Sequence, residues 1–178
     1  MADYSTNMAA LPRHGHIVST FFANIFSLFK EKKVYALQEQ HALVFYGKKW
    51  SKEERLVDVS ALENAGEFKS LVIDELDFVQ PDFMMFKDNP FLQSANTLKT
   101  AGVPDLVVEV WSRSNTHEER GMKHSLYSSH GKCEHWYLTH DSNKVECWLG
   151  KSEMKPQALT DVLVTRHGIE FDLRYLAI

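Results

Sequence analysis

Hydrophobic residues in the first part of the chain recur at the spacing of an amphipathic helix. Between positions 17 and 29 they fall every three or four residues, which predicts one long helix with a wide buried face. Pro12 can occupy its first turn, and the charged residues 30–33 mark its end. The stretch contains four polar residues and is shorter than the roughly 20 residues that cross a bilayer, so we expect a core helix and no membrane span.

Short runs rich in β-forming residues follow the helix and predict strands. Residues 34–38 and 42–46 are separated by a few polar positions and are expected to form a strand pair. Further strands are expected at 71–73 and within 78–86. Residues 106–111 are Leu-Val-Val-Glu-Val-Trp, and such a nearly unbroken apolar run just after a proline is typical of a central strand covered on both faces.

The last third of the chain predicts one helix followed by strands. Thr116 and Glu119 have the spacing of a capping box, and Gly131 stands where the helix would end. Residues 87–102 have the polarity of a loop. Residues 134–139 and 144–149 are expected to form a hairpin, and a last strand or two is expected around 162–164 and 169–173. Because there is no internal repeat and no linker, residues 1–178 are expected to form a single α/β domain.

Composition limits the classes of protein to which the chain can belong. Its 178 residues, 44% of them hydrophobic and 25% charged, have the profile of a globular domain. Cys133 and Cys147 are too few for a secreted disulfide framework and lack the spacing of a zinc site, so we expect free thiols in a reducing compartment. The opening residues carry no secretory signal, which favours a cytoplasmic protein with no membrane partner.

The charge distribution favours a local contact with nucleic acid over a bulk electrostatic one. The net charge of −4 is unlike that of proteins that coat nucleic acid. Between Arg113 and Lys132, however, four Lys or Arg residues stand against two Glu. This segment is either a local basic surface or a solvated helix face with mixed charge.

A glutamate interrupts the most apolar strand of the chain. Strand alternation places Val107, Glu109 and Trp111 on one face and the other three residues of the run on the opposite face. Burying an unpaired carboxylate is costly, so a metal ion, a basic partner or a raised pKa must offset the charge of Glu109. The plainer alternatives are an edge-strand residue or the partner of an arginine.

Two further polar residues join this glutamate as candidates for a site. Asp82 interrupts a second apolar run, and two carboxylates on two strands are what a hard divalent cation requires, although an aspartate after a proline is also a common turn former. Lys123 shares one face of the predicted helix with Glu119 and Tyr127, at steps of four residues. A surface ion pair between Glu119 and Lys123 explains the same spacing.

Four motifs, taken together, resemble those of a known family. They are QPD at 80–82, GVPDLVVEVWSRS at 102–114, ERGMKHSLY at 119–127 and GKCEHWYL at 131–138, after an HG-x-I-V opening of the first helix at His14. In order and spacing they are similar to the restriction-endonuclease-like proteins of the Uma-two family, in the PD-(D/E)XK nuclease superfamily. The resemblance implies a restriction-endonuclease-like core, with a mixed central β-sheet flanked by helices, in which the strands of Asp82 and Glu109 pair.

The resemblance also implies a chemistry for the candidate residues. Asp82 and Glu109, with the backbone carbonyl of Val110, would bind Mg²⁺ or Mn²⁺, and Lys123 would align the attacking water or neutralise charge on the phosphate. The residues that would support and orient Lys123 are Glu119 and Tyr127. The expected activity is divalent-metal-dependent hydrolysis of phosphodiester bonds in nucleic acid, by a DNA endonuclease. The alternative is a catalytically inactive module of the same fold that binds DNA or a protein partner, with a homodimer as one form.

The chain departs from the superfamily pattern at two places. Two residues after the glutamate, where the motif has its lysine, stands Trp111, so Lys123 must reach in from the helix. Relatives carry an acidic strand before the first helix that is not seen here. A third acidic ligand is therefore either missing or supplied from elsewhere, with Asp74, Glu75 and Asp77 as the candidates.

A zinc-dependent hydrolase is a third class to consider, because the chain has nine histidines. The pairs His14-x-His16 and His135 with His140 lack a third ligand at helical or hairpin spacing. We therefore expect these histidines to lie at the surface and to bind no zinc.

Overall fold

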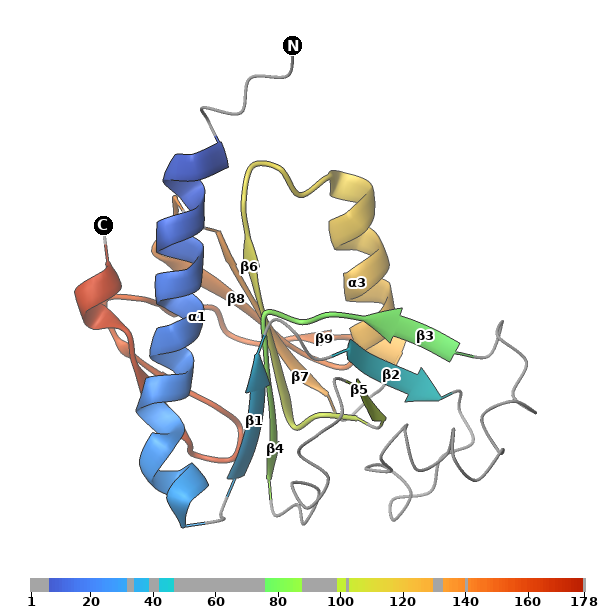
Figure 1. The fold of residues 1–178 in the computed structure, drawn as a ribbon, viewed down its shortest axis with the longest axis horizontal. Helices are drawn as coiled ribbons and strands as arrows, with labels where there is room; N and C mark the ends of the chain where they lie inside the picture. Colours follow the sequence, from blue (N-terminus) through green and yellow to red (C-terminus); the bar gives the residue numbers. More distant parts are fainter. Residues whose placement is uncertain are drawn as a thin grey trace.

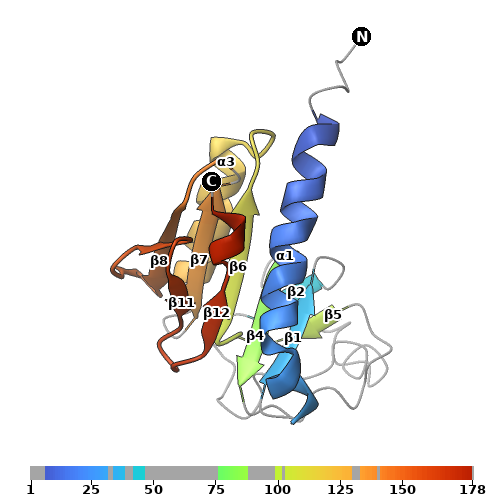
Figure 2. The same ribbon diagram turned by 90° about the vertical axis from the view of Figure 1, so that its left-hand side faces the viewer.

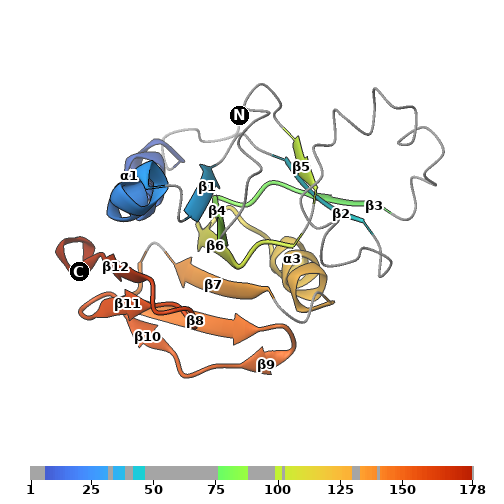
Figure 3. The same ribbon diagram turned by 90° about the horizontal axis from the view of Figure 1, so that it is seen from below.

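The computed structural model describes residues 7–31, 34–38, 42–46, 76–87, 99–101, 103–129, 133–139 and 141–177. Over these residues the chain forms a mixed β-sheet with one helix on each face, as Figures 1 and 3 show. The helices are α1 (Asn7–Lys30) and α3 (His117–Ser129). The predicted α/β fold class, a central sheet flanked by helices, is confirmed.

The main sheet has its strands in the order β1-β4-β6-β7-β8-β10, with β9 paired to β8. β6 and β7 run parallel, whereas the other neighbours in this order are antiparallel. A parallel pair needs a crossover connection, and α3, which lies between β6 and β7 in the chain, provides it. The strands are β1 (Val34–Gln38), β4 (Phe83–Lys87), β6 (Leu106–Trp111), β7 (Glu134–Thr139), β8 (Lys144–Leu149), β9 (Ser152–Glu153) and β10 (Gln157–Ala158).

β6 lies in the middle of the sheet and is buried on both faces, as its apolar sequence predicts. The face with Leu106, Val108 and Val110 belongs to the same core as α1. The opposite face, with Val107 and Trp111, packs with residues of α3. Each fully buried aliphatic side chain of this kind contributes about 1.5–3 kcal/mol to stability. The predicted alternation is therefore confirmed, and it places Glu109 on the face covered by α3.

α1 is longer at its N-terminal end than the sequence pattern predicts. It begins at Asn7, so Pro12 lies inside the helix and not in its first turn. A proline removes one backbone N–H, but residues 8–11 (Met-Ala-Ala-Leu) are strong helix formers that extend the helix beyond it. None of the described helices is long and apolar enough to cross a membrane. The buried stripe of α1 consists of Ile17, Val18, Phe21 and Ile25.

The last strands expected from the sequence are present, and they form a hairpin that lies beside α1 (Figure 2). β11 (Val162–Val164) pairs with β12 (Glu170–Asp172). The side chain of Asn24 on α1 accepts a hydrogen bond from the N–H of Asp172 at 2.8 Å and donates one to its carbonyl at 3.2 Å. The ring of Phe171 lies 5.0 Å from that of Phe21, centroid to centroid. One polar side chain and one aromatic contact therefore join this hairpin to the helix.

The strands predicted at 34–38 and 42–46 are present, but they do not pair with each other. β1 joins the main sheet beside β4, whereas β2 (Ala42–Tyr46) pairs with β3 (Leu76–Val79) and β5 (Lys99–Ala101) in a separate sheet. Val34 and Ala36 are buried in the core that contains α1, which favours the pairing of β1 with β4. The expectation of a loop at 87–102 is wrong for residues 99–101, which form strand β5. The strand expected at 71–73 lies outside the described residues.

Local signals around α3 and the following hairpin are confirmed where the structure describes them. The hydroxyl of Thr116 accepts a hydrogen bond from the N–H of Glu119 at 3.1 Å, as an N-cap does. β7 and β8 form the predicted hairpin, and its register places Cys147 opposite Trp136. Cys133 and Cys147 are both free and buried. The cap expected at Gly131 lies outside the described residues.

The expectation of surface histidines is wrong for His135, which is fully buried on β7. Its Nδ1 lies 3.3 Å from the carbonyl oxygen of Cys133, and its Nε2 has no hydrogen-bond partner within the described part of the chain. Burial lowers the pKa of His135 from 6.5 to about 4, although the contact with Cys133 opposes this shift. The folded protein therefore keeps His135 neutral at a pH where the unfolded chain protonates it.

Acid should destabilise the fold through His135. Its folded pKa is the lower one, so the stability is complete above pH 6.5 and is lost as the pH falls toward about 4. Between about pH 7.5 and about pH 5 we expect the free energy of unfolding to fall by about 2 kcal/mol on this account. Urea unfolding should show a smaller fall for His135→Phe, whereas the same change at exposed His117 should leave the fall unaltered. Equal falls in wild type and His135→Phe would contradict the prediction.

Candidate active site

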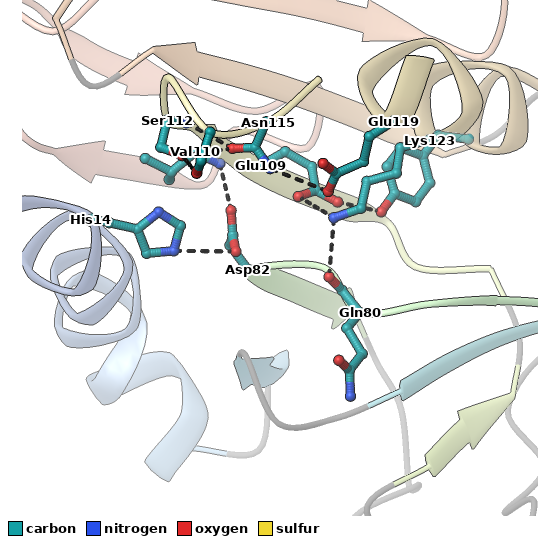
Figure 4. Close-up of polar contacts among 11 residues, drawn as sticks. His14, Gln80, Asp82, Glu109, Val110, Ser112, Asn115, Glu119 and Lys123 are labelled. Carbon is teal, nitrogen blue, oxygen red and sulfur yellow. Dashed lines mark hydrogen bonds and ion pairs between the residues drawn. The ribbon is translucent and has the colours of Figure 1, made fainter. Parts of the chain in front are cut away.

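Asp82 lies in a bend immediately before β4 and faces β6. The antiparallel register of β4 and β6 places it opposite Glu109. Its Oδ2 accepts a hydrogen bond from the backbone N–H of Val110 at 2.6 Å, and its Oδ1 lies 3.2 Å from Nε2 of His14 on α1 (Figure 4). The Asp82 carboxylate is thus held from two sides, by a central strand and by a helix.

Glu109 lies in the middle of β6, with only 1% of its side chain exposed. Its Oε2 accepts a hydrogen bond from Nζ of Lys123 at 2.9 Å, and its Oε1 accepts one from the hydroxyl of Tyr127 at 2.5 Å. Both donors come from α3, one helical turn apart. Of the three ways to offset the Glu109 charge that the sequence leaves open, the structure therefore provides a basic partner.

The structure also provides another of these three ways, a raised pKa of Glu109. Burial, helped by the neighbouring Asp82 charge, raises the pKa of Glu109 from 4.5 to about 7, while Lys123 and Tyr127 act in the opposite direction. Burial, together with the Glu109 charge, raises the pKa of Tyr127 well above its usual value, so its hydroxyl stays protonated and remains a donor. The Asp82 and Glu109 carboxylates are thus close enough to repel each other in a poorly solvated place.

Lys123 contacts both Glu109 and the segment that leads to Asp82. Besides Glu109, its Nζ contacts the backbone carbonyl oxygen of Gln80 at 3.3 Å, in the segment that leads to Asp82. Nζ also lies 5.5 Å from the ring centroid of Trp111. Its side chain is 14% exposed. An ammonium group has three N–H donors, so two protein acceptors leave one donor for a ligand.

Of the two supporting residues expected from the sequence, the structure places one at the centre and the other at the edge. Tyr127 contacts Glu109, as described above. Glu119 accepts a hydrogen bond from the side-chain amide of Asn115 at 3.1 Å, and Asn115 also accepts one from the N–H of Ser112 at 2.8 Å. Glu119 therefore orders the loop between β6 and α3, and its described contact is with Asn115 and not with Lys123.

His14 is a site residue that the sequence analysis placed at the surface. It lies on α1, three and four residues before Ile17 and Val18, which are both buried. The available signal was this spacing, since a histidine one turn before the buried stripe lies on the same face as the stripe. Only the packing of α1 against the sheet could show that this face meets Asp82.

The groups at this site match the ligands that Mg²⁺ or Mn²⁺ prefers. Mg²⁺ is typically bound through one or two carboxylates and keeps several waters, and each carboxylate oxygen here has a lone pair beyond its described contact. The backbone carbonyl of Val110, whose N–H donates a hydrogen bond to Asp82, is the third oxygen donor expected from the sequence. Within the described residues no group of three His, Cys, Asp or Glu side chains converges on a metal position.

Of the expected substitutes for a third acidic ligand, Asp77 belongs to β3 in the separate small sheet. Asp74 and Glu75 fall outside the described residues. Among the described residues the candidate donors are two carboxylates and one backbone carbonyl, which fits a hydrated cation.

Comparison with known proteins shows which family the chain belongs to. The family Uma2, described as "Putative restriction endonuclease", matches residues 50–174, which is more than half of the chain. The chain belongs to the Uma2 family. The matched range contains Asp82, Glu109, Lys123 and Tyr127, whereas the Uma2 match begins after α1 and His14.

A solved structure has the same fold as this Uma2 protein. It is described as the crystal structure of "a putative nuclease belonging to DUF820 from Anabaena variabilis ATCC 29413". The two are similar with a TM-score of 0.63 and 14% sequence identity, over 93% of this chain and 82% of that one. At this identity the similarity concerns the fold alone. No curated protein matches the sequence.

The Glu109 carboxylate of this Uma2 protein should make stability fall with rising pH. Its folded pKa is the higher one, so its contribution is complete below pH 4.5 and is lost as the pH rises through about 7. In the presence of chelator, we expect wild type to lose about 2 kcal/mol relative to Glu109→Gln between about pH 5 and about pH 8. Urea unfolding measures the difference, and Glu118→Gln, at an exposed site on α3, should follow wild type. A Glu109→Gln curve parallel to that of wild type would refute this account.

Proposed function

We propose that this protein is a divalent-cation-dependent nuclease that hydrolyses phosphodiester bonds, with DNA as its substrate. The observation that carries the proposal is the buried Glu109 carboxylate, which lies beside a second carboxylate, Asp82, and is reached by Lys123. Family membership supports a nuclease-like function. Replacing a whole buried ion pair by apolar residues is often neutral or stabilising, so stability alone does not explain the Glu109–Lys123 pair.

Each residue has a distinct role in the proposed reaction. Asp82 and Glu109, with the carbonyl of Val110, would hold Mg²⁺ or Mn²⁺. When bound, such a cation supplies polarisation of a phosphoryl oxygen and lowers the pKa of a coordinated water. Lys123 keeps one donor that can orient the attacking water or a phosphate oxygen. Tyr127 fixes the position of the Glu109 carboxylate, and His14 does the same for Asp82.

The second candidate function is a non-catalytic DNA-binding module. One observation favours it: Lys123 and Tyr127 already occupy both oxygens of Glu109, so its charge is offset without a cation. In that case the Lys123–Glu109 ion pair would contribute only to the stability of the fold. The two functions differ in whether Asp82 and Glu109 bind a divalent ion.

Cleavage should require both the cation and the three charged residues. Nicking of supercoiled plasmid in the presence of Mg²⁺ or Mn²⁺ should be abolished by chelator, and should fall by about 100-fold or more in Asp82→Asn, Glu109→Gln and Lys123→Met. Glu118→Gln should cleave like wild type. Parallel assays on RNA of matched sequence test the assignment to DNA. Equal nicking by wild type and Glu109→Gln would show that this site is not catalytic.

Cation binding separates the nuclease from the binding module. Isothermal titration of the protein with Mn²⁺ should give one saturable site that Asp82→Asn and Glu109→Gln remove. Lys123→Met should retain binding, because its ammonium group is not a ligand but a competitor for Glu109. If wild type has no saturable Mn²⁺ site and does not cleave, the module is the correct function.

A further inference from the structure

A second site lies beside the candidate active site, and Trp111 is part of its lining. It is a pocket of about 350 Å³ between α3 and the β7–β8 hairpin. Pockets that bind small ligands begin at about 300 Å³, so the volume is sufficient for one planar ring system. The side chains that matter for its chemistry are Trp111, Arg120, His124, Tyr137, Lys144 and Trp148.

Aromatic rings form much of the pocket wall. Trp111 and Tyr137 are stacked, with ring centroids 5.5 Å apart and planes 18° from parallel. Trp148 meets His124 edge to face at 4.6 Å, and the hydroxyl of Tyr137 lies 3.1 Å from Nδ1 of His124. These contacts hold the rings in fixed positions. A flat ligand would meet a preformed surface, and little side-chain entropy would be lost on binding.

Charged groups surround these rings. The Arg120 guanidinium lies 5.6 Å from the ring centroid of Trp111 and donates a hydrogen bond to the carbonyl oxygen of Ser112 at 2.7 Å. Lys144 is exposed at the start of β8, and the exposed Glu146 also lines the pocket. The positive charges of Arg120 and Lys144 favour the binding of a polyanion just outside the pocket. A carboxylate in the lining disfavours a phosphate inside it and can accept hydrogen bonds from an amino group on a ring.

Trp111 and α3 connect this pocket to the candidate active site. Trp111 follows Glu109 by two residues on β6 and therefore lies on the same face of the sheet. Along α3, Arg120 and His124 line the pocket, whereas Lys123 and Tyr127 reach Glu109. Figure 4 shows Lys123 at Glu109. A nucleic-acid strand bound at Lys123 would thus pass directly beside the aromatic walls.

We propose that this pocket binds one unpaired base of the nucleic-acid strand whose backbone lies at Asp82, Glu109 and Lys123. The inference rests on the proposed nuclease function and narrows its substrate to a strand with a base free of its partner next to the cleaved phosphate. Stacking on aromatic side chains is available to every base, so the pocket selects for the unpaired state more than for sequence. Arg120 and Lys144 hold the adjoining phosphates.

Binding without cleavage provides the test. With chelator present, fluorescence anisotropy compares wild-type affinity for a labelled single-stranded DNA, for the same strand carrying an abasic residue at each position in turn, and for its blunt duplex. We expect one abasic position to weaken binding about 5-fold to 100-fold, and the duplex to bind more weakly than the single strand. Trp148→Ala should weaken binding of the intact strand by a similar factor and remove the effect of the abasic residue. Tyr175→Ala, at an exposed aromatic residue on another part of the surface, should behave as wild type.

Two measures keep the proposal falsifiable if Trp148→Ala is poorly folded. Lys144→Glu changes an exposed residue, so it should preserve the thermal unfolding transition and still weaken single-strand binding. The abasic scan uses the wild-type protein. Equal affinity for single strand and duplex with no sensitive abasic position would overturn the proposal even if plasmid is cleaved. Abasic sensitivity in a protein that does not cleave would leave the pocket established and the nuclease function rejected.

Discussion

The contact between Lys123 and Glu109 is what allows a carboxylate to lie in the most apolar strand of this protein. Glu109 is almost fully buried, and its ammonium partner lies 2.9 Å away on the helix that crosses over the same face. Removing one partner from such a pair leaves the other charge uncompensated, which destabilises the fold by about 3–5 kcal/mol. The crossover helix α3 must therefore pack where it does, because no other described residue pairs ionically with Glu109.

This constraint has consequences for the architecture around it. β6 and β7 are parallel, so the helix between them must cross one face of the sheet, and that face is the one to which Glu109 points. α1 covers the opposite face with an apolar stripe and places His14 beside Asp82, just before β4. Residues from both helices therefore contact the two acidic side chains. The raised pKa of Glu109 shows that this place is poorly solvated and contains two neighbouring carboxylates.

α3 is a single element with two chemical faces. Residues at steps of four, Lys123 and Tyr127, hold Glu109, while Arg120 and His124, on the neighbouring face, line the aromatic pocket. Trp111 lies within 6 Å of a cation from each of these two regions, 5.5 Å from Lys123 and 5.6 Å from Arg120. It also lines the pocket, so this position on β6 contributes to the surroundings of both.

Local patterns in the sequence determined the central strand, the α3 cap and the inward direction of Glu109, because alternation and capping act between residues a few positions apart. Tertiary structure alone decided the pairing of β1 with β4 in place of β2, the contact of His14 with Asp82, and the burial of His135. Each of these joins segments far apart in the chain, where many partners satisfy the same local pattern. The choice among them depends on which surfaces can be buried together, and that is settled only when the whole core packs.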